Sequence, residues 1–103
     1  MARFLLIETQ SAVAARLPGD AAALRAGGND VVLVLAQDGV TVAVGPAAAV
    51  RGLADLGVPV LVDDFSLAVR GLRVEDVAAG TRACPIDAVT DLLLRPGTRV
   101  VWH

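Results

Sequence analysis

The chain of 103 residues contains no lysine and no tyrosine, and its one histidine, His103, is the final residue. These absences exclude a lysine Schiff base, a P-loop lysine, a Ser-His-Asp triad inside the fold and a histidine-rich metal site. The single cysteine, Cys84, excludes an internal disulfide and any CxxC pair. Aromatic residues make up only 3%, so the core must be built from Ala, Val and Leu. We expect no cofactor and no metal centre.

Charge and hydropathy narrow the class of protein further. The formal net charge is -2, and direct nucleic-acid binding is not expected because phosphate backbones require a clustered positive surface. Hydrophobic residues reach 55%, which argues against disorder and predicts one domain over residues 1–103. The apolar run 4–7 ends at Glu8, too early for a signal peptide, and no run reaches the length of a membrane helix. We therefore expect a cytoplasmic protein, which suits a lone thiol.

Apolar runs alternate with Ala-rich segments along the whole chain. The runs predict strands over residues 3–9, 31–35, 58–62 and 99–102, with a further short strand before Cys84. The segments between them predict helices over residues 20–26 (capped by Asp20), 46–56 (Pro46 near its start), 66–71 (closed by Gly71) and 85–94 (Pro85 in its first turn). Continuous rather than alternating runs are typical of strands buried on both faces. The expected fold is α/β, a three-layer α/β/α sandwich with a mostly parallel sheet of about five strands.

Polar groups directly follow four of these runs. They are residues 8–10, residues 37–39, the pair Asp63 and Asp64, and Cys84. Binding sites of open α/β sheets lie at the carboxyl ends of the strands, so we expect the four groups to share one edge.

Two of the groups have a structural interpretation and a functional one. Gln37 and Asp38, followed by Gly39, suit a turn in which glycine takes a positive φ, or else a ligand-binding or partner-binding edge. For Asp63 and Asp64 the structural interpretation is a helix cap made by Asp64 or by a nearby serine. Their functional interpretation is a paired-acid or metal site, or part of the same ligand-binding or partner-binding edge, although adjacent residues of an extended chain point in opposite directions.

Cys84 is the only candidate catalytic nucleophile. It precedes Pro85 and an expected helix, and a helix N-terminus together with Arg82 can lower the pKa of a thiol. Asp87 opposes that effect, and a free cysteine is also commonly a small buried hydrophobe. Both interpretations stay open at this point.

Trp102 lies on the last expected strand, where a tryptophan serves as a core residue or as an anchor between subunits. We expect the subunit interface. A chain of this size and apolar composition is expected to expose apolar area that a partner covers, and therefore to form oligomers.

Three blocks of sequence together resemble the DsrE/DsrF/DsrH-like family, most of all its short DsrH/TusB branch. The blocks are DVVLVLAQDGV at residues 30–40, VLVDDFSLAVRGL at residues 60–72, and the helix 86–94 followed by a strand ending in Val101 and Trp102. The resemblance covers residues 30–103 well and residues 1–29 more loosely.

This resemblance implies a five-stranded α/β/α fold and assembly with copies of the chain or with DsrE-like paralogues. It also implies a part in sulfur trafficking, such as sulfur oxidation or a tRNA-thiolation relay. In the DsrE branch a persulfide-carrying cysteine ends the third strand, and here that position falls on Asp63. The first hypothesis is thus an accessory or relay subunit. The alternative is an oligomeric small-ligand or partner-binding module without thiol chemistry; an independent enzyme is disfavoured because partners for a nucleophile are lacking.

Overall fold

The computed structural model describes residues 2–44 and 48–103. Within these residues, five strands alternate with four α-helices and two 3₁₀ helices, in the order β1 (Arg3–Glu8), α1 (Leu17–Ala26), β2 (Asp30–Leu35), η1 (Gln37–Ala43), α2 (Ala48–Asp55), β3 (Val60–Asp63), α3 (Asp64–Val69), η2 (Val74–Asp76), β4 (Thr81–Cys84), α4 (Ile86–Leu93) and β5 (Thr98–Trp102). Among the described residues, no helix is long and apolar enough to cross a membrane.

The five strands form one sheet in the order β4-β3-β2-β1-β5, and every pairing between them is parallel. The α/β fold class expected from the continuous apolar runs is therefore confirmed, with a sheet that is wholly parallel. Three of the four predicted runs lie on the central strands β1, β2 and β3, which are covered on both faces. The fourth run, residues 99–102, lies on the edge strand β5 and is exposed.

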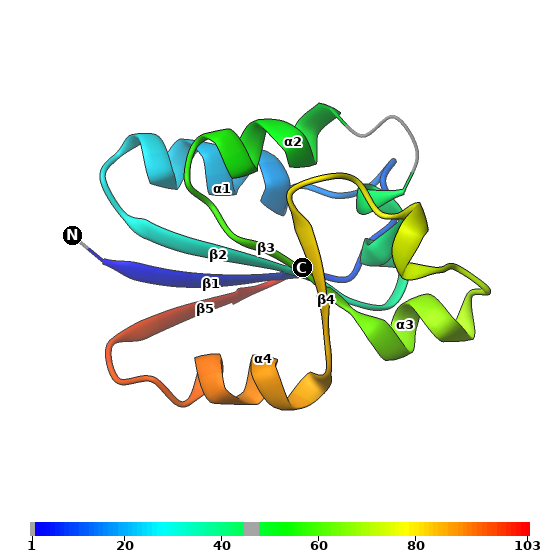
Figure 1. Ribbon diagram of the computed structural model, residues 1–103. Helices are drawn as coiled ribbons and strands as arrows, with labels where there is room; N and C mark the ends of the chain where they lie inside the picture. The colour runs from blue at the N-terminus through cyan, green and yellow to red at the C-terminus, as the bar shows by residue number, and fades with distance from the viewer. Residues whose placement is uncertain (1, 45–47) are drawn as a thin grey trace.

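The helices divide between the two faces of the sheet (Figure 1), with α1 and α2 on one face and α4 on the other. This division follows from the strand order. Strands β1 to β4 advance in one direction across the sheet, and the chain then crosses back to place β5 beside β1. Since parallel crossovers are right-handed, reversing the direction moves the connecting helix to the opposite face. Each face covers its own apolar core, the larger beneath α1 and α2 and the smaller beneath α4.

The third strand begins two residues later than expected, at Val60 rather than Val58. The amide of Val58 instead donates to the Leu53 carbonyl at 2.9 Å and closes the end of α2. Pro59 has no amide to donate to a neighbouring strand and joins the ladder only through its carbonyl, which accepts from the Leu33 amide at 3.0 Å, so the register pairs begin at Val60.

The first helix also begins earlier than expected, at Leu17 rather than Asp20, and Asp20 is not its cap. The amides of Arg16 and Leu17 are bound by the carboxylate of Glu8, which lies at the end of β1. This acceptor is supplied by the tertiary fold, and the local pattern around Asp20 contains no sign of it.

The end of α1 at Ala26 is the expected one, and the end of α2 and the bounds of α3 and α4 differ from the expected ones by one or two residues. The interpretation of Pro46 as a helix start lies outside the described residues, and α2 is described from Ala48. Pro85 occupies the N-cap position of α4 rather than its first turn. Gly71, with a φ of 68°, follows the end of α3 as predicted.

The turn after β2 uses glycine for a different reason than the sequence suggested. The left-handed conformation belongs to Gln37, with a φ of 53°, and not to Gly39. A Cβ atom on Gly39 would lie 2.0 Å from the carbonyl oxygen of Glu8, so glycine is required there by the close approach of two backbones.

Candidate functional site

The carboxyl edge of the sheet brings together the polar groups that the sequence placed there. Because all five strands are parallel, Glu8, Asp63 and Cys84 end their strands at the same edge. Asp63 and Cys84 are direct partners in the β3–β4 register. The predicted shared edge therefore exists, and its individual side chains decide what it can do.

Cys84 is buried, with 6% of its surface exposed, and belongs to the apolar core beneath α4. Burial raises the pKa of the Cys84 thiol, and the negative charges of Asp63 and Asp64 raise it further, outweighing the opposite effect of Arg82. This direction is opposite to the lowered pKa that a catalytic role would require. The geometry supports the small buried hydrophobe.

Asp63 is the cap of α3, a role that the sequence analysis gave to Asp64 or to a serine. Its Oδ2 accepts hydrogen bonds from the backbone amide of Ser66 at 3.1 Å and from the Ser66 hydroxyl at 2.5 Å. Asp64, one residue later, is exposed. The two carboxylates therefore face different surroundings and do not form a paired-acid site.

Ser66 connects this cap to the next strand end. Its Oγ accepts a hydrogen bond from the backbone amide of Gln37 at 2.8 Å, while its own proton goes to Asp63. The bond holds Gln37 in its left-handed conformation, which costs free energy in a residue with a Cβ atom. The backbone amide of Gln37 is thus already bound by Ser66, and this hydrogen bond serves to hold the turn after β2 in place.

Asp38 forms an ion pair across the same edge. Its Oδ1 accepts from Arg70 Nη2 at 2.7 Å and from Arg70 Nε at 3.2 Å, and Arg70 Nη1 donates to the Ser66 carbonyl at 3.1 Å. The pair ties η1 to the end of α3. Because Asp38 is largely exposed, the pair is screened by solvent and contributes little to stability.

Glu8 and His103 form a contact that the sequence analysis did not foresee. The carboxylate of Glu8 is fully buried. It lies 2.9 and 3.1 Å from Nδ1 of His103 and accepts from the backbone amides of Gln10, Arg16 and Leu17 at 2.7 to 3.0 Å. A local pattern could not reveal this contact, since 95 positions separate the two residues.

Burial alone would raise the pKa of Glu8, but the hydrogen bonds from Leu17, Gln10, Arg16 and His103 together lower it below its ordinary value of 4.5. The carboxylate is therefore ionised at neutral pH, and Nδ1 of His103 must carry the proton of their hydrogen bond. A carboxylate bound by this many donors is a weak base, so Glu8 anchors three segments rather than performing proton transfer.

The same contact fills the crevice between β1 and β5. In doubly wound sheets, ligands bind where the order of strands reverses, here between the carboxyl ends of these two strands. The amide of His103 donates to the Ile7 carbonyl at 2.9 Å, and the His103 carbonyl accepts from the Thr9 amide at 2.7 Å. The backbone hydrogen bonds between β1 and β5 thus continue past the end of β5. The backbone of His103 therefore lies at the position where doubly wound sheets usually bind a ligand.

Trp102 is 64% exposed on β5, so it is not a core residue of this chain. Its register partner Ile7 and the pair Leu5–Val100 place Trp102 and Val100 on the α4 face of the sheet. We call the exposed apolar residues of this face the β5–α4 patch: Ile86, Leu93, Val100 and Trp102. The patch contains exposed apolar area of the kind expected around Trp102, and a subunit interface there stays a prediction.

A small cavity of about 90 Å³ opens within this patch, and its lining includes Ile86, Leu93, Trp102 and Asp63. Asp63 Oδ1 is buried and has no hydrogen-bond partner among the described residues. Such an atom is an acceptor that lacks a donor. In residues 2–44 and 48–103, no three His, Cys, Asp or Glu side chains are close enough to hold a metal ion.

Comparisons with known proteins address the fold and not the chemistry. No protein-family model matches the chain, and no curated protein matches it. Among solved structures, the chain is similar to the protein of unknown function MTH1491 from Methanobacterium thermoautotrophicum and to the ychN protein from E. coli. Each comparison has a TM-score of 0.82 at 15% identity and covers 100% of both chains. At this identity the likeness establishes the fold alone.

Proposed function

We propose that this chain is an accessory subunit of intracellular sulfur trafficking, of the sulfur-oxidation or tRNA-thiolation type. In this proposal it acts in the cytoplasm by assembling with another chain of the same fold, either a copy of itself or a DsrE-like paralogue. It does not carry sulfur on its own cysteine. The sequence resemblance supports the sulfur context, and the structure of the carboxyl edge supports the non-carrying role.

The single observation behind the non-carrying role is the environment of the only thiol. A sulfur carrier needs a thiolate that a donor can reach, whereas Cys84 is buried and two aspartates raise its pKa. Asp63 occupies the position where the resemblance implies the carrier cysteine, and its carboxylate caps α3. The edge therefore holds its loops in place and offers no nucleophile.

The β5–α4 patch supports assembly. Trp102 and Ile86 are each more than 60% exposed and line one apolar cavity, and aromatic anchors of this kind are enriched at protein interfaces. A donor group from a partner would also supply the hydrogen bond that Asp63 Oδ1 lacks.

The role as a carrier is tested by intact mass spectrometry after incubation with a cysteine desulfurase and cysteine. We expect no added sulfur on the wild-type chain or on a Cys84→Ser control, together with slow alkylation of the native thiol. A gain of one sulfur that disappears in the control and on reduction would instead make Cys84 a carrier.

Assembly is tested by sedimentation of the wild-type chain, alone and mixed with a DsrE-like chain that carries the sulfur cysteine. We expect association at micromolar concentration, weakened about thirtyfold or more by Trp102→Ser, because truncating an anchor removes about 2 kcal/mol or more. Val13→Ser is the matched control, since Val13 is 98% exposed and lies outside the patch. A strict monomer in both conditions would contradict the proposal.

A cavity lined by arginines lies at the opposite edge of the sheet. This cavity favours the alternative function, a small-ligand-binding module without thiol chemistry.

A further inference from the structure

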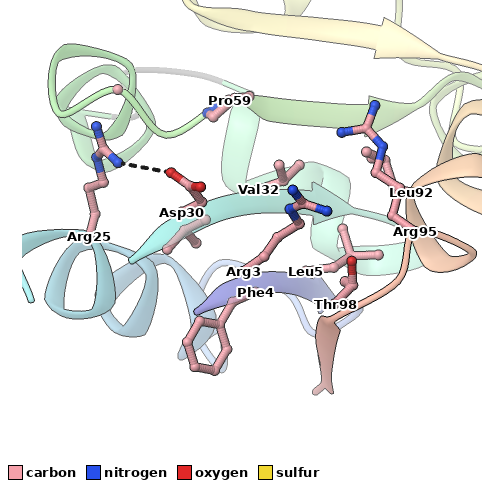
Figure 2. A pocket seen from close by; sticks show the side chains of 12 residues that line it. Arg3, Phe4, Leu5, Arg25, Asp30, Val32, Pro59, Leu92, Arg95 and Thr98 are labelled. Carbon is pink, nitrogen blue, oxygen red and sulfur yellow. Dashed lines mark ion pairs between the residues drawn. The ribbon is translucent and has the colours of Figure 1, made fainter. Parts of the chain in front are cut away.

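A cavity of about 330 Å³ lies at the amino edge of the sheet, opposite the candidate site. Its lining includes Arg3, Asp30 and Thr98, which are the first residues of β1, β2 and β5. Figure 2 shows these side chains together with those of Arg25 and Arg95. The volume falls within the range of small-molecule sites.

The charge of this cavity differs from that of the chain. Three guanidinium groups and one carboxylate line it, which gives a local charge of +2 in a chain whose formal net charge is -2. One of the arginines is neutralised, because Arg25 Nη1 lies 3.5 Å from Asp30 Oδ1. Arg25 is also held in place, since its Nε donates to the Leu56 carbonyl at 3.1 Å.

The other two arginines have almost no protein partners. The guanidinium of Arg3 makes one long hydrogen bond, 3.5 Å from Nη1 to the Pro96 carbonyl. Among the described residues, the guanidinium of Arg95 makes no hydrogen bond and no ion pair. Since a guanidinium has five N–H donors, about four on Arg3 and all of those on Arg95 remain for solvent or for a ligand.

Thr98 adds a third donor that lacks a partner. Its Oγ1 is buried and has no hydrogen-bond partner among the described residues. The backbone amide of Thr98 donates to the Arg95 carbonyl at 3.3 Å, so the orphan hydroxyl belongs to the same corner as Arg95. Because this hydroxyl is closed off from solvent, the Thr98 side chain must rotate to present it to a ligand oxygen, and the new hydrogen bond would recover the free energy that a buried hydroxyl without a partner costs.

The remainder of the lining is apolar, with Leu5, Val32 and Leu92 among its residues. Polar donors beside an apolar lining suit a ligand that joins an anionic group to an apolar body.

We propose that this cavity binds a small organic phosphate, whose phosphate group is held by Arg3, Arg95 and the Thr98 hydroxyl and whose body lies against Leu5, Val32 and Leu92. The three donors come from β1, from the turn after α4 and from β5, so three separate segments contribute to the site. A phosphate monoester carries about two negative charges at neutral pH, which matches the local charge of +2. The proposal does not depend on the sulfur-trafficking role.

The test is a titration of the wild-type chain with phenyl phosphate, followed by calorimetry and by backbone amide NMR shifts. We expect saturable binding with shifts centred on Arg3, Arg95 and Thr98. Inorganic phosphate should bind more weakly, because it lacks the apolar body. Phenyl sulfate has the same shape with a single charge, and it should also bind more weakly than phenyl phosphate if the charge of the cavity selects the ligand.

Three variants test the individual donors. Arg3→Gln and Arg95→Gln should each weaken phenyl phosphate binding about tenfold or more, the effect of losing a charge-assisted hydrogen bond. Thr98→Val should weaken it several-fold while leaving the unliganded protein at least as stable, because valine replaces an unsatisfied hydroxyl with a methyl group. Arg51→Gln, an exposed arginine outside the cavity, is the matched control and should change nothing.

Two results would overturn the proposal. One is the absence of saturable binding at millimolar phenyl phosphate. The other is binding by Arg3→Gln and Arg95→Gln with the affinity of the Arg51→Gln control. Either result leaves the sulfur-transfer and sedimentation experiments unaffected, so the two proposals fail separately.

Discussion

The two edges of the sheet contain similar kinds of polar side chains but use them differently. At the carboxyl edge, Glu8 and Ser66 bind backbone amides of neighbouring segments, and Asp38 is paired with Arg70. At the amino edge, Arg95 and the Thr98 hydroxyl have no side-chain hydrogen-bond partner among the described residues. Apart from Asp63 Oδ1, the first edge is internally satisfied, whereas the second edge leaves the Arg95 guanidinium and the Thr98 hydroxyl without partners among the described residues.

This difference shows why the position of a polar residue is not enough to assign its role. The rule that sites lie at the carboxyl ends of parallel strands led us to expect several polar residues at one edge of the sheet, and the structure places them there. The hydrogen bonds there show that most of these residues hold loops together. Groups that remain unsatisfied after folding are better candidates for binding, because a folded protein rarely leaves them so without a ligand or solvent.

The largest expected effect is at Glu8. Glu8→Ala removes the acceptor of three backbone amides and of His103, and we expect a loss of about 3–5 kcal/mol in the free energy of unfolding, typical of a broken buried charged network. Urea unfolding followed by circular dichroism measures it. Glu75→Ala, at the only other glutamate, is exposed and should change stability by less than about 0.5 kcal/mol.

The pH dependence of stability identifies the charge of Glu8 as the cause. Because its pKa is lowered on folding, its contribution is fully present above the unfolded-state pKa near 4.5 and is lost as pH falls through the lower folded pKa. Unfolding at a series of acidic pH values should show a smaller decline in Glu8→Gln than in the wild type. Equal declines would contradict the role of Glu8 as an anchor.

An intermediate effect is expected at Ser66. Ser66→Ala removes the acceptor of the Gln37 amide and one donor to Asp63, and we expect a loss of about 2 kcal/mol, the cost of buried groups left unsatisfied. Thermal and urea unfolding measure it. Ser11→Ala, at the chain's other serine, is the control, and a loss as small as that of the control would show that the carboxyl edge is not held by this network.

The smallest effect is expected at the amino edge. Without ligand, Arg3→Gln and Arg95→Gln should each change the free energy of unfolding by less than about 0.5 kcal/mol, since neither guanidinium is bound tightly by the protein. The same urea experiments measure it. A loss above about 1 kcal/mol would mean that these arginines are structural, and the contrast between the two edges would disappear.

Local patterns were informative wherever a local physical cause decided the structure. Continuous runs such as residues 31–35 identified buried parallel strands, and Gly71 marked the end of a helix. Errors arose where a distant residue supplied the deciding contact. Asp20 is a plausible cap by its position, but the carboxylate that binds the first amides of α1 comes from Glu8. The role of Gly39 likewise depends on the Glu8 carbonyl, which lies in another strand.

For the candidate site, the sequence predicted which edge of the sheet the polar residues share, but not the role of each side chain. The sequence indicated that Asp63 and Cys84 would lie at one edge of the sheet, and the structure makes them register partners. It left open whether the Cys84 thiol would be activated, because its pKa depends on burial and on the directions of nearby carboxylates. The contact between Glu8 and His103 and the cavity of Arg3 and Arg95 join residues far apart in the chain, and no local pattern signals them.

The order of apolar and polar residues by itself determined that this protein is an α/β fold with a parallel sheet, because the period and continuity of hydrophobic residues decide which segments can be buried as strands. Only the tertiary structure decided which polar groups are satisfied and which are free. Whether a polar group finds a partner depends on its distance from residues that are far away in the chain but close in the fold. It depends also on whether water is excluded between them.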